Sequence, residues 1–156
     1  MNILVTLNRG YLYQLCVMLS SLIKSNPDTE FDVYVMNASL AEADFEAVRQ
    51  RIPADKCRLI DIKTGDNEFA DAPITDRYPR EMYFRIFAAK YLPESLDRIL
   101  YLDPDIVVLG SVKELYETNL DGYYYAAASH VKEVMRMINK IRLGMDDEGP
   151  VSYTHL

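Results

Sequence analysis

Apolar positions along the chain follow two spacings in turn, and this alternation predicts strands and helices in regular succession. Short apolar or alternating runs are typical of strands, and they occur at residues 3–6, 31–36, 58–62, 98–102 and 123–128. Apolar residues at helical spacing fill most of the intervals, over residues 12–23, 39–52, 82–91, 111–117 and 131–143. A βαβα order of this kind predicts an α/β fold whose mostly parallel sheet is flanked by helices.

Local signals suggest where some of these elements begin and end. Ser39-Leu40-Ala41-Glu42 resembles a capping box and predicts a helix start. Residues 106–109 are expected to stay extended after the fourth strand. Residues 63–80 are polar and broken by glycine and proline, so we expect a loop there. Within that loop, residues 71–79 are either a lid over a ligand or an ordinary surface loop.

Length and composition indicate one soluble globular domain. The chain has 156 residues, of which 49% are hydrophobic and 26% charged. Its net charge of −7 argues against a nucleic-acid partner, since phosphate binding requires a basic surface. Cys16 and Cys57 have no metal-ligand spacing. No signal peptide or long apolar run is found, so we expect a cytoplasmic protein, with peripheral attachment at the inner face of the membrane left open.

Two carboxylates follow the clearest of the predicted strands. Asp103 and Asp105 flank Pro104 directly after residues 98–102. Ligands of open α/β sheets bind beyond the carboxyl ends of the strands, and residues i and i+2 of an extended chain point to the same side. Both carboxylates are therefore expected to reach one Mg²⁺ or Mn²⁺ ion, which could neutralise a diphosphate leaving group. Asp-Pro-Asp is also ordinary turn chemistry, so a plain turn remains the alternative.

The chain resembles glycosyltransferase family 8 from residue 1 to about residue 150. The resemblance rests on the motif Tyr101-Leu102-Asp103-Pro104-Asp105 and on Tyr83-Phe84-Arg85 before it. It also rests on Leu115-Tyr116-Glu117-Thr118-Asn119-Leu120 after the motif, and on the opening residues 2–6 with Tyr11 and Ser20-Ser21-Leu22. It implies the GT-A fold, a Rossmann-like fold of enzymes that bind nucleotide-diphospho-sugars.

By this resemblance the chain binds a nucleotide-sugar donor, with a UDP-sugar expected, and Mn²⁺ or Mg²⁺. Asp103 and Asp105 are the implied metal ligands, and Asp103 and Pro104 would also lie near the donor. Arg85 would face the donor sugar and diphosphate, because its planar group of donors suits oxyanions.

Three further positions are implied for the nucleoside. Thr6, Asn8 and Tyr11 are expected to hold it, and a tyrosine there could stack on the base. The implied reaction is retaining transfer of a hexose to a cell-surface glycan or lipid-linked acceptor, as in bacterial lipopolysaccharide synthesis.

The sequence departs from the family pattern in two places. Asn8-Arg9-Gly10 stands where members commonly have Asp-Asp-Asn, which leaves selectivity for uridine open. The family's later segments, including a histidine metal ligand, have no match, and neither His130 nor His155 is assigned that role.

We therefore expect residues 1–150 to be an incomplete donor-binding domain that is inactive by itself, and residues 151–156 to be a tail of uncertain origin. The apolar stripe predicted for the helix over residues 131–143 would then promote self-association.

Two other functions stay open at this point. An apolar strand followed by Asp-x-Asp also resembles the first motif of haloacid dehalogenase-type phosphatases, in which Asp103 would be the nucleophile. That motif usually opens its domain, whereas here about a hundred residues precede it. The third possibility is a non-catalytic fragment that only binds nucleotide-sugars.

Overall fold

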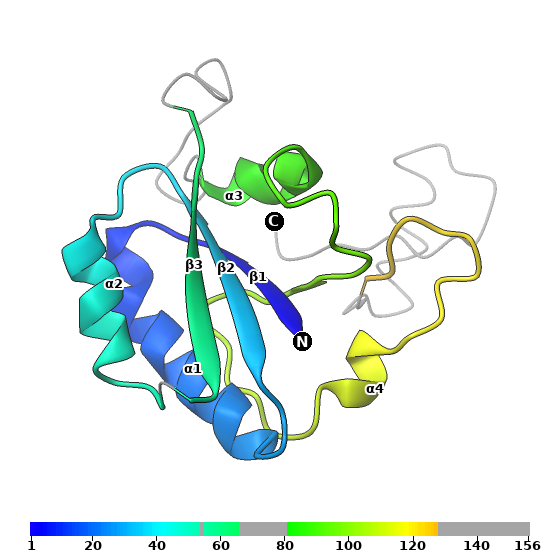
Figure 1. Cartoon of the computed structure of the whole chain (residues 1–156), viewed down its shortest axis with the longest axis horizontal. Coiled ribbons are helices and arrows are strands. Elements are labelled where there is room, and N and C mark those ends of the chain that lie inside the picture. The colour runs from blue at the N-terminus through cyan, green and yellow to red at the C-terminus, as the bar shows by residue number, and fades with distance from the viewer. Residues whose placement is uncertain (54, 66–80, 128–156) are drawn as a thin grey trace, which may run out of the picture. The chain divides into compact units, whose positions relative to one another are not determined.

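A computed structural model of the chain describes residues 1–53, 55–65 and 81–127 (Figure 1). The chain forms two compact units, Met1–Glu117 and Thr118–Leu156. Every described helix and strand lies in the first unit. Among the described residues, no helix has both the length and the apolar character needed to cross a bilayer.

The first unit contains a four-stranded sheet in which all neighbouring strands run parallel. Its strands are β1 (Asn2–Thr6), β2 (Phe31–Asn37), β3 (Cys57–Lys63) and β4 (Leu100–Tyr101), in the spatial order β3-β2-β1-β4. β1 pairs with β2 along its whole length, and Leu4 lies opposite both Tyr34 of β2 and Tyr101 of β4. The predicted α/β fold with a mostly parallel sheet is confirmed.

Helices cover both faces of this sheet, which explains why its inner strands are apolar almost throughout. On one face α1 (Leu12–Ser25) and α2 (Glu42–Arg49) pack against Ile3, Val5, Val33 and Val35. On the other face α3 (Glu81–Phe84) continues into a short 3₁₀ helix, η2 (Arg85–Lys90), and Phe84 and Ala88 pack against Leu4, Tyr34 and Met36 (Figure 1). Successive residues of β1 and β2 therefore alternate between two cores.

Serine and asparagine side chains of α1 hold the segment that follows β4. The Ser21 hydroxyl accepts a hydrogen bond from the Val108 N–H, and the Ser25 hydroxyl donates to the Val108 carbonyl, each at 2.9 Å. Just beyond the end of α1, Asn26 donates to the Leu22 carbonyl and accepts from the Val112 N–H. Within residues 106–109, predicted to continue extended, Val108 thus bonds to α1, and none of these residues pairs with a described strand.

The structure corrects the predicted start of α2. The helix begins at Glu42 with Ala41 as its N-cap, two residues beyond the predicted cap Ser39. The Asp44 carboxylate accepts from the Ala41 N–H at 2.9 Å. Because alanine has no side-chain acceptor, only this half of a capping box exists. The reciprocal contact is made by backbone, from the Asp44 N–H to the Ala41 carbonyl.

Two predicted strands also differ from the structure. The clearest one, over residues 98–102, is reduced to Leu100–Tyr101, and one further bond from the Leu102 N–H to the Leu4 carbonyl ends the pairing before the chain turns. Residues 123–127 of the strand predicted over 123–128 are described and form no strand. They follow a tight turn at Asp121–Gly122, where φ is positive at both residues, and the rings of Tyr123, Tyr124 and Tyr125 are exposed.

The remaining helices follow the predictions with shifted ends. α4 (Lys113–Tyr116) is shorter than the helix predicted over residues 111–117, with Val112 as its N-cap. The helix predicted over residues 82–91 corresponds to α3 and η2, with a kink at Phe87. The candidate lid at 71–79, the helix over 131–143, His130, His155 and residues 151–156 lie outside the described residues.

Candidate functional site

The order of the strands in the sheet reverses between β1 and β4. From β1 the chain crosses by α1 to β2 and then to β3, whereas β4 lies on the other side of β1. In parallel sheets the loops that leave the two strands at such a reversal diverge and open a crevice at their carboxyl ends. Thr6 ends β1, and Asp103–Pro104–Asp105 follows β4, so the residues predicted from these two distant segments lie at the carboxyl ends of neighbouring strands.

Four polar side chains meet there on the face covered by α3 and η2. The Tyr101 hydroxyl donates to Asp103 Oδ1 at 2.7 Å, and the Thr6 and Tyr101 hydroxyls are 3.2 Å apart. A guanidinium nitrogen of Arg85 lies 3.4 Å from the same Oδ1 atom. The Arg85 guanidinium carbon also lies 4.6 Å from the centre of the Tyr101 ring, within cation–π range.

One carboxylate and one guanidinium thus lie together in a partly buried environment. The side chains of Arg85 and Asp103 are 21% and 38% exposed, so both remain open to a ligand. Burial raises the pKa of Tyr101, which keeps its hydroxyl protonated and able to donate at neutral pH. Thr6 is buried, and its hydroxyl is directed into this group of side chains.

The second carboxylate of the motif lies in a different setting. Pro104 is buried and Asp105 is exposed, and both are part of a turn. The alternation that puts Tyr101 and Asp103 on one face of the strand therefore ends before Asp105, contrary to the extended geometry assumed from the sequence. Asp105 makes no hydrogen bond or ion pair with any described residue.

The donor atoms present fit a hard divalent cation in part. Asp103 and Asp105 supply carboxylate oxygens, which Mg²⁺ and Mn²⁺ prefer. Within residues 1–53, 55–65 and 81–127, no group of three or more acidic, histidine or cysteine side chains gathers at one place. Asp103 and Asp105 would thus hold such an ion together with oxygens of water or a ligand.

The turn after β1 has a defined conformation. The Asn8 carboxamide oxygen accepts from the Gly10 N–H at 3.0 Å, and the Asn8 carbonyl accepts from the Tyr11 N–H. Arg9 forms an ion pair with Asp44 of α2 at 2.9 Å. Tyr11 is 38% exposed and begins α1 as its N-cap. The Asn8 oxygen is thus occupied within the turn, and its amide nitrogen is the group that remains for a ligand.

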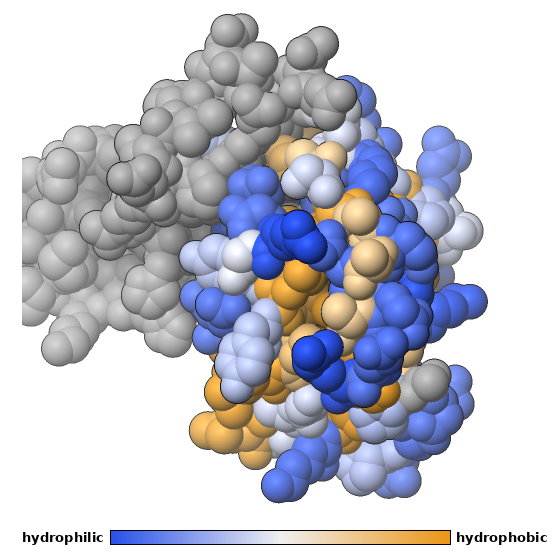
Figure 2. All heavy atoms as spheres, turned by 90° about the vertical axis from the view of Figure 1, so that its left-hand side faces the viewer, coloured by the Kyte–Doolittle hydropathy of each residue, from blue (hydrophilic) through white to orange (hydrophobic). Residues whose placement is uncertain are grey.

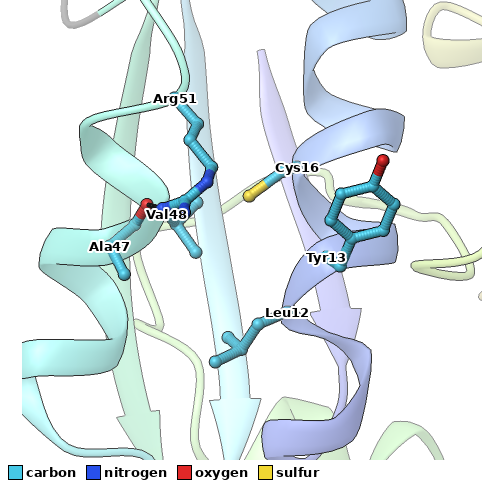
Figure 3. A pocket seen from close by; sticks show the side chains of 6 residues that line it. All are labelled: Leu12, Tyr13, Cys16, Ala47, Val48 and Arg51. Carbon is cyan, nitrogen blue, oxygen red and sulfur yellow. Dashed lines mark hydrogen bonds between the residues drawn. The ribbon is translucent and has the colours of Figure 1, made fainter.

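A hollow lies away from the strand ends, between α1 and α2. Its volume is about 170 Å³, and Figure 3 shows Leu12 and Cys16 of α1 facing Val48 of α2, with Arg51 folded back toward the Ala47 carbonyl. Figure 2 views the molecule from this side and shows apolar atoms bordered by hydrophilic ones. The lining contains no carboxylate for a hard cation, and burial raises the pKa of the Cys16 thiol, which disfavours a reactive thiolate.

Comparison with known proteins identifies the family. The model of glycosyl transferase family 8 matches residues 2–150. This chain belongs to glycosyl transferase family 8. The resemblance noted from the Asp103–Pro104–Asp105 motif is therefore confirmed, and the phosphatase alternative loses its support.

Several members of the family are similar over most of the chain. The lipopolysaccharide 1,2-glucosyltransferase of Escherichia coli K12 is 29% identical over 90% of this chain, and the lipopolysaccharide 1,3-galactosyltransferase of Salmonella typhimurium is 29% identical over 76% of it. The chain spans only 40% and 35% of these two relatives. The crystal structure of the galactosyltransferase LgtC in complex with donor and acceptor sugar analogs is 29% identical, with a TM-score of 0.77, over 95% of this chain and 53% of LgtC. The GT-A fold expected from the sequence is confirmed by this match.

The structure adds residues that the sequence analysis of this family 8 chain did not single out for the site. Tyr101 was noted only as part of the motif, although its position two residues before Asp103 on a strand places both side chains on one face. Asp44 was not considered at all. No local signal links it to Arg9, 35 residues earlier, because that contact depends on how α2 packs beside the turn after β1.

Proposed function

We propose that this chain is the donor-binding part of a metal-dependent, retaining glycosyltransferase. It would take a hexose from a nucleotide-sugar, with a UDP-sugar as the expected donor, to a cell-surface glycan or lipid-linked acceptor. Family membership supports the reaction class. The names of the lipopolysaccharide glucosyl- and galactosyltransferases, and the sugar analogs bound in LgtC, support the donor and acceptor classes.

The observation that carries this proposal is the pairing of Arg85 and Asp103 at the strand-order reversal. A diphosphate needs positive charge, and a carboxylate beside it is tolerated only if a cation lies between them. Arg85 supplies part of the charge as a planar donor to oxyanions. Asp103 and Asp105 would hold Mn²⁺ or Mg²⁺, which when bound neutralises the charge that develops on the leaving diphosphate.

The turn after β1 fits the nucleoside end of the same ligand. The Asn8 amide nitrogen can donate to a base edge, and the Tyr11 ring, 38% exposed, offers a face on which a base can stack. Thr6 is the least suited of the three predicted nucleoside contacts, because it is only 6% exposed and its hydroxyl bonds Tyr101. We propose that Thr6 acts through Tyr101 instead.

Calorimetric titration of UDP, with and without Mn²⁺, tests the proposal. Asp103→Asn and Asp105→Asn should each weaken Mn²⁺-dependent UDP binding by about tenfold or more, equivalent to about 1.4 kcal/mol. Asp97→Asn is the matched control, because Asp97 is exposed at the amino end of β4, away from the site. Equal affinity in wild type and both site variants would refute the metal-dependent donor site.

A further inference from the structure

One side chain, that of Tyr101, contacts three of the segments that build the site. Its hydroxyl lies between Thr6 of β1 and Asp103 of the loop after β4, while the ring of the same side chain lies against Arg85 of η2. The two carboxylates of the motif do not by themselves account for the contacts of this hydroxyl. Its contacts therefore need an explanation of their own.

We propose that Tyr101 is a positioning residue that fixes the Asp103 carboxylate for the metal and aligns Arg85 beside it. This inference rests on the proposed metal-dependent donor binding. Asp103 lies on a loop and its side chain is 38% exposed, so without a partner its carboxylate would turn among several rotamers. The 2.7 Å bond from Tyr101 to Oδ1 restricts that rotation.

The direction of the hydrogen bonds follows from the groups themselves. A carboxylate oxygen only accepts, and the Tyr101 hydroxyl has a single hydrogen, which it donates to Asp103. Thr6 must then donate its own hydrogen to the Tyr101 oxygen. The chain of bonds runs in one direction, from Thr6 to Tyr101 to Asp103. It tethers the metal-ligand loop to β1, the strand beside β4.

The Tyr101 ring aligns Arg85, the group proposed to bind the diphosphate. Arg85 lies over the ring and reaches the same Oδ1 atom that Tyr101 bonds. Oδ1 is thus engaged by two partners, whereas Oδ2 makes no hydrogen bond or ion pair with any described residue. One partly buried aromatic side chain thus orients both a metal ligand and an anion-binding guanidinium, as outer-shell partners of metal ligands commonly do.

Substitutions at Tyr101 separate the hydroxyl from the ring. Tyr101→Phe removes the bond to Asp103 but keeps the surface under Arg85, and Thr6→Val removes only the bond that Tyr101 accepts. Tyr116→Phe is the matched control. Its hydroxyl also bonds at the other end of the sheet, accepting from the Asn2 backbone N–H and side-chain amide and donating to the Arg98 carbonyl.

The measurement is a Mn²⁺ titration of this chain in the presence of UDP, followed by electron paramagnetic resonance, together with thermal melting in the absence of metal. Tyr101→Phe should lower the Mn²⁺ affinity by about tenfold to a hundredfold, and Thr6→Val should lower it less. Tyr116→Phe should lower the melting temperature at least as much as Tyr101→Phe while leaving the Mn²⁺ affinity unchanged.

Two outcomes would overturn the inference by itself. One is an unchanged Mn²⁺ affinity in Tyr101→Phe, and the other is an equal loss in Tyr101→Phe and Tyr116→Phe, which would indicate a global effect. Absence of UDP-dependent Mn²⁺ binding in the wild-type chain would overturn both this inference and the proposed function.

Discussion

Asp44 offers a test of how the turn after β1 is held against α2. Its side chain is 8% exposed, accepts from the Ala41 N–H at 2.9 Å at the start of α2, and pairs with Arg9 at 2.9 Å. Loss of a side-chain acceptor at a helix start costs about 0.5–2 kcal/mol. Loss of a negative charge in the first turn costs about 0.3–1 kcal/mol.

The ion pair itself should contribute less. The Arg9 side chain is 78% exposed, and exposed pairs are worth about 0–1 kcal/mol. Adding these ranges, we expect Asp44→Ala to lower the free energy of unfolding by about 2 kcal/mol and Asp44→Asn by about 1 kcal/mol, since asparagine keeps an acceptor for the Ala41 N–H. Arg9→Ala should cost less than about 0.5 kcal/mol.

Urea unfolding followed by circular dichroism measures these differences from the shift of the midpoint at constant slope. Glu42→Ala is the control. The Glu42 side chain carries a first-turn charge, is 76% exposed, pairs with Arg49 and does not cap the helix. If Asp44→Asn cost as much as Asp44→Ala, the acceptor would not be the source of the stability. If Arg9→Ala cost as much as Asp44→Ala, the estimate for the ion pair would be wrong.

Two further predictions concern the cores on either side of the sheet. Phe84 is fully buried beside the helix that bears Arg85, so Phe84→Ala should lower the free energy of unfolding by about 3–5 kcal/mol. Ile86 is 68% exposed, and Ile86→Ala should change the free energy of unfolding by less than about 0.5 kcal/mol in the same urea titration. Burial raises the pKa of Cys57 to about 12 and also raises that of Cys16. Iodoacetamide at about pH 7 to 9 should therefore modify the native chain far more slowly than the urea-unfolded chain. Equal rates would show that these thiols are not buried. Because the folded-state pKa of Cys57 is the higher one, its contribution to stability is fully present below its ordinary value of 9.0 and is lost as the pH rises from there toward about 12.

Strand and helix positions in the first hundred residues followed closely from the sequence. The runs at residues 3–6, 31–36 and 58–62 are β1, β2 and β3 with ends that differ by one residue. The inner strands β1 and β2 are covered on both faces and are therefore largely apolar, whereas the edge strand β3 alternates between more and less buried positions. The helix over residues 12–23 likewise follows from a buried stripe that repeats at helical spacing.

The predicted elements were wrong where strand pairing or helix capping depended on the choice of partner residues. Residues 98–102 have strand composition throughout, yet only Leu100–Tyr101 pair, because the chain turns after Leu102. Residues 123–127 also have strand composition but form no strand, and their tyrosines are exposed. Strand propensity reflects packing against neighbours, and a single sequence does not say which neighbours exist.

The sequence by itself determined the parallel α/β class, the family, and the presence of Asp103 and Asp105 at the end of a strand. The α/β class follows from the local spacing of apolar residues, and the family follows from the resemblance of the motif around Asp103 and Asp105 to known members. Tertiary structure alone decided that Thr6 would meet Tyr101, 95 positions later, and that Arg85 would lie over the ring of the same tyrosine. It also decided that Arg9 would pair with Asp44. The physical reason is that such contacts depend on strand order and on the face each helix covers, and those are settled by packing the whole sheet rather than by any one segment.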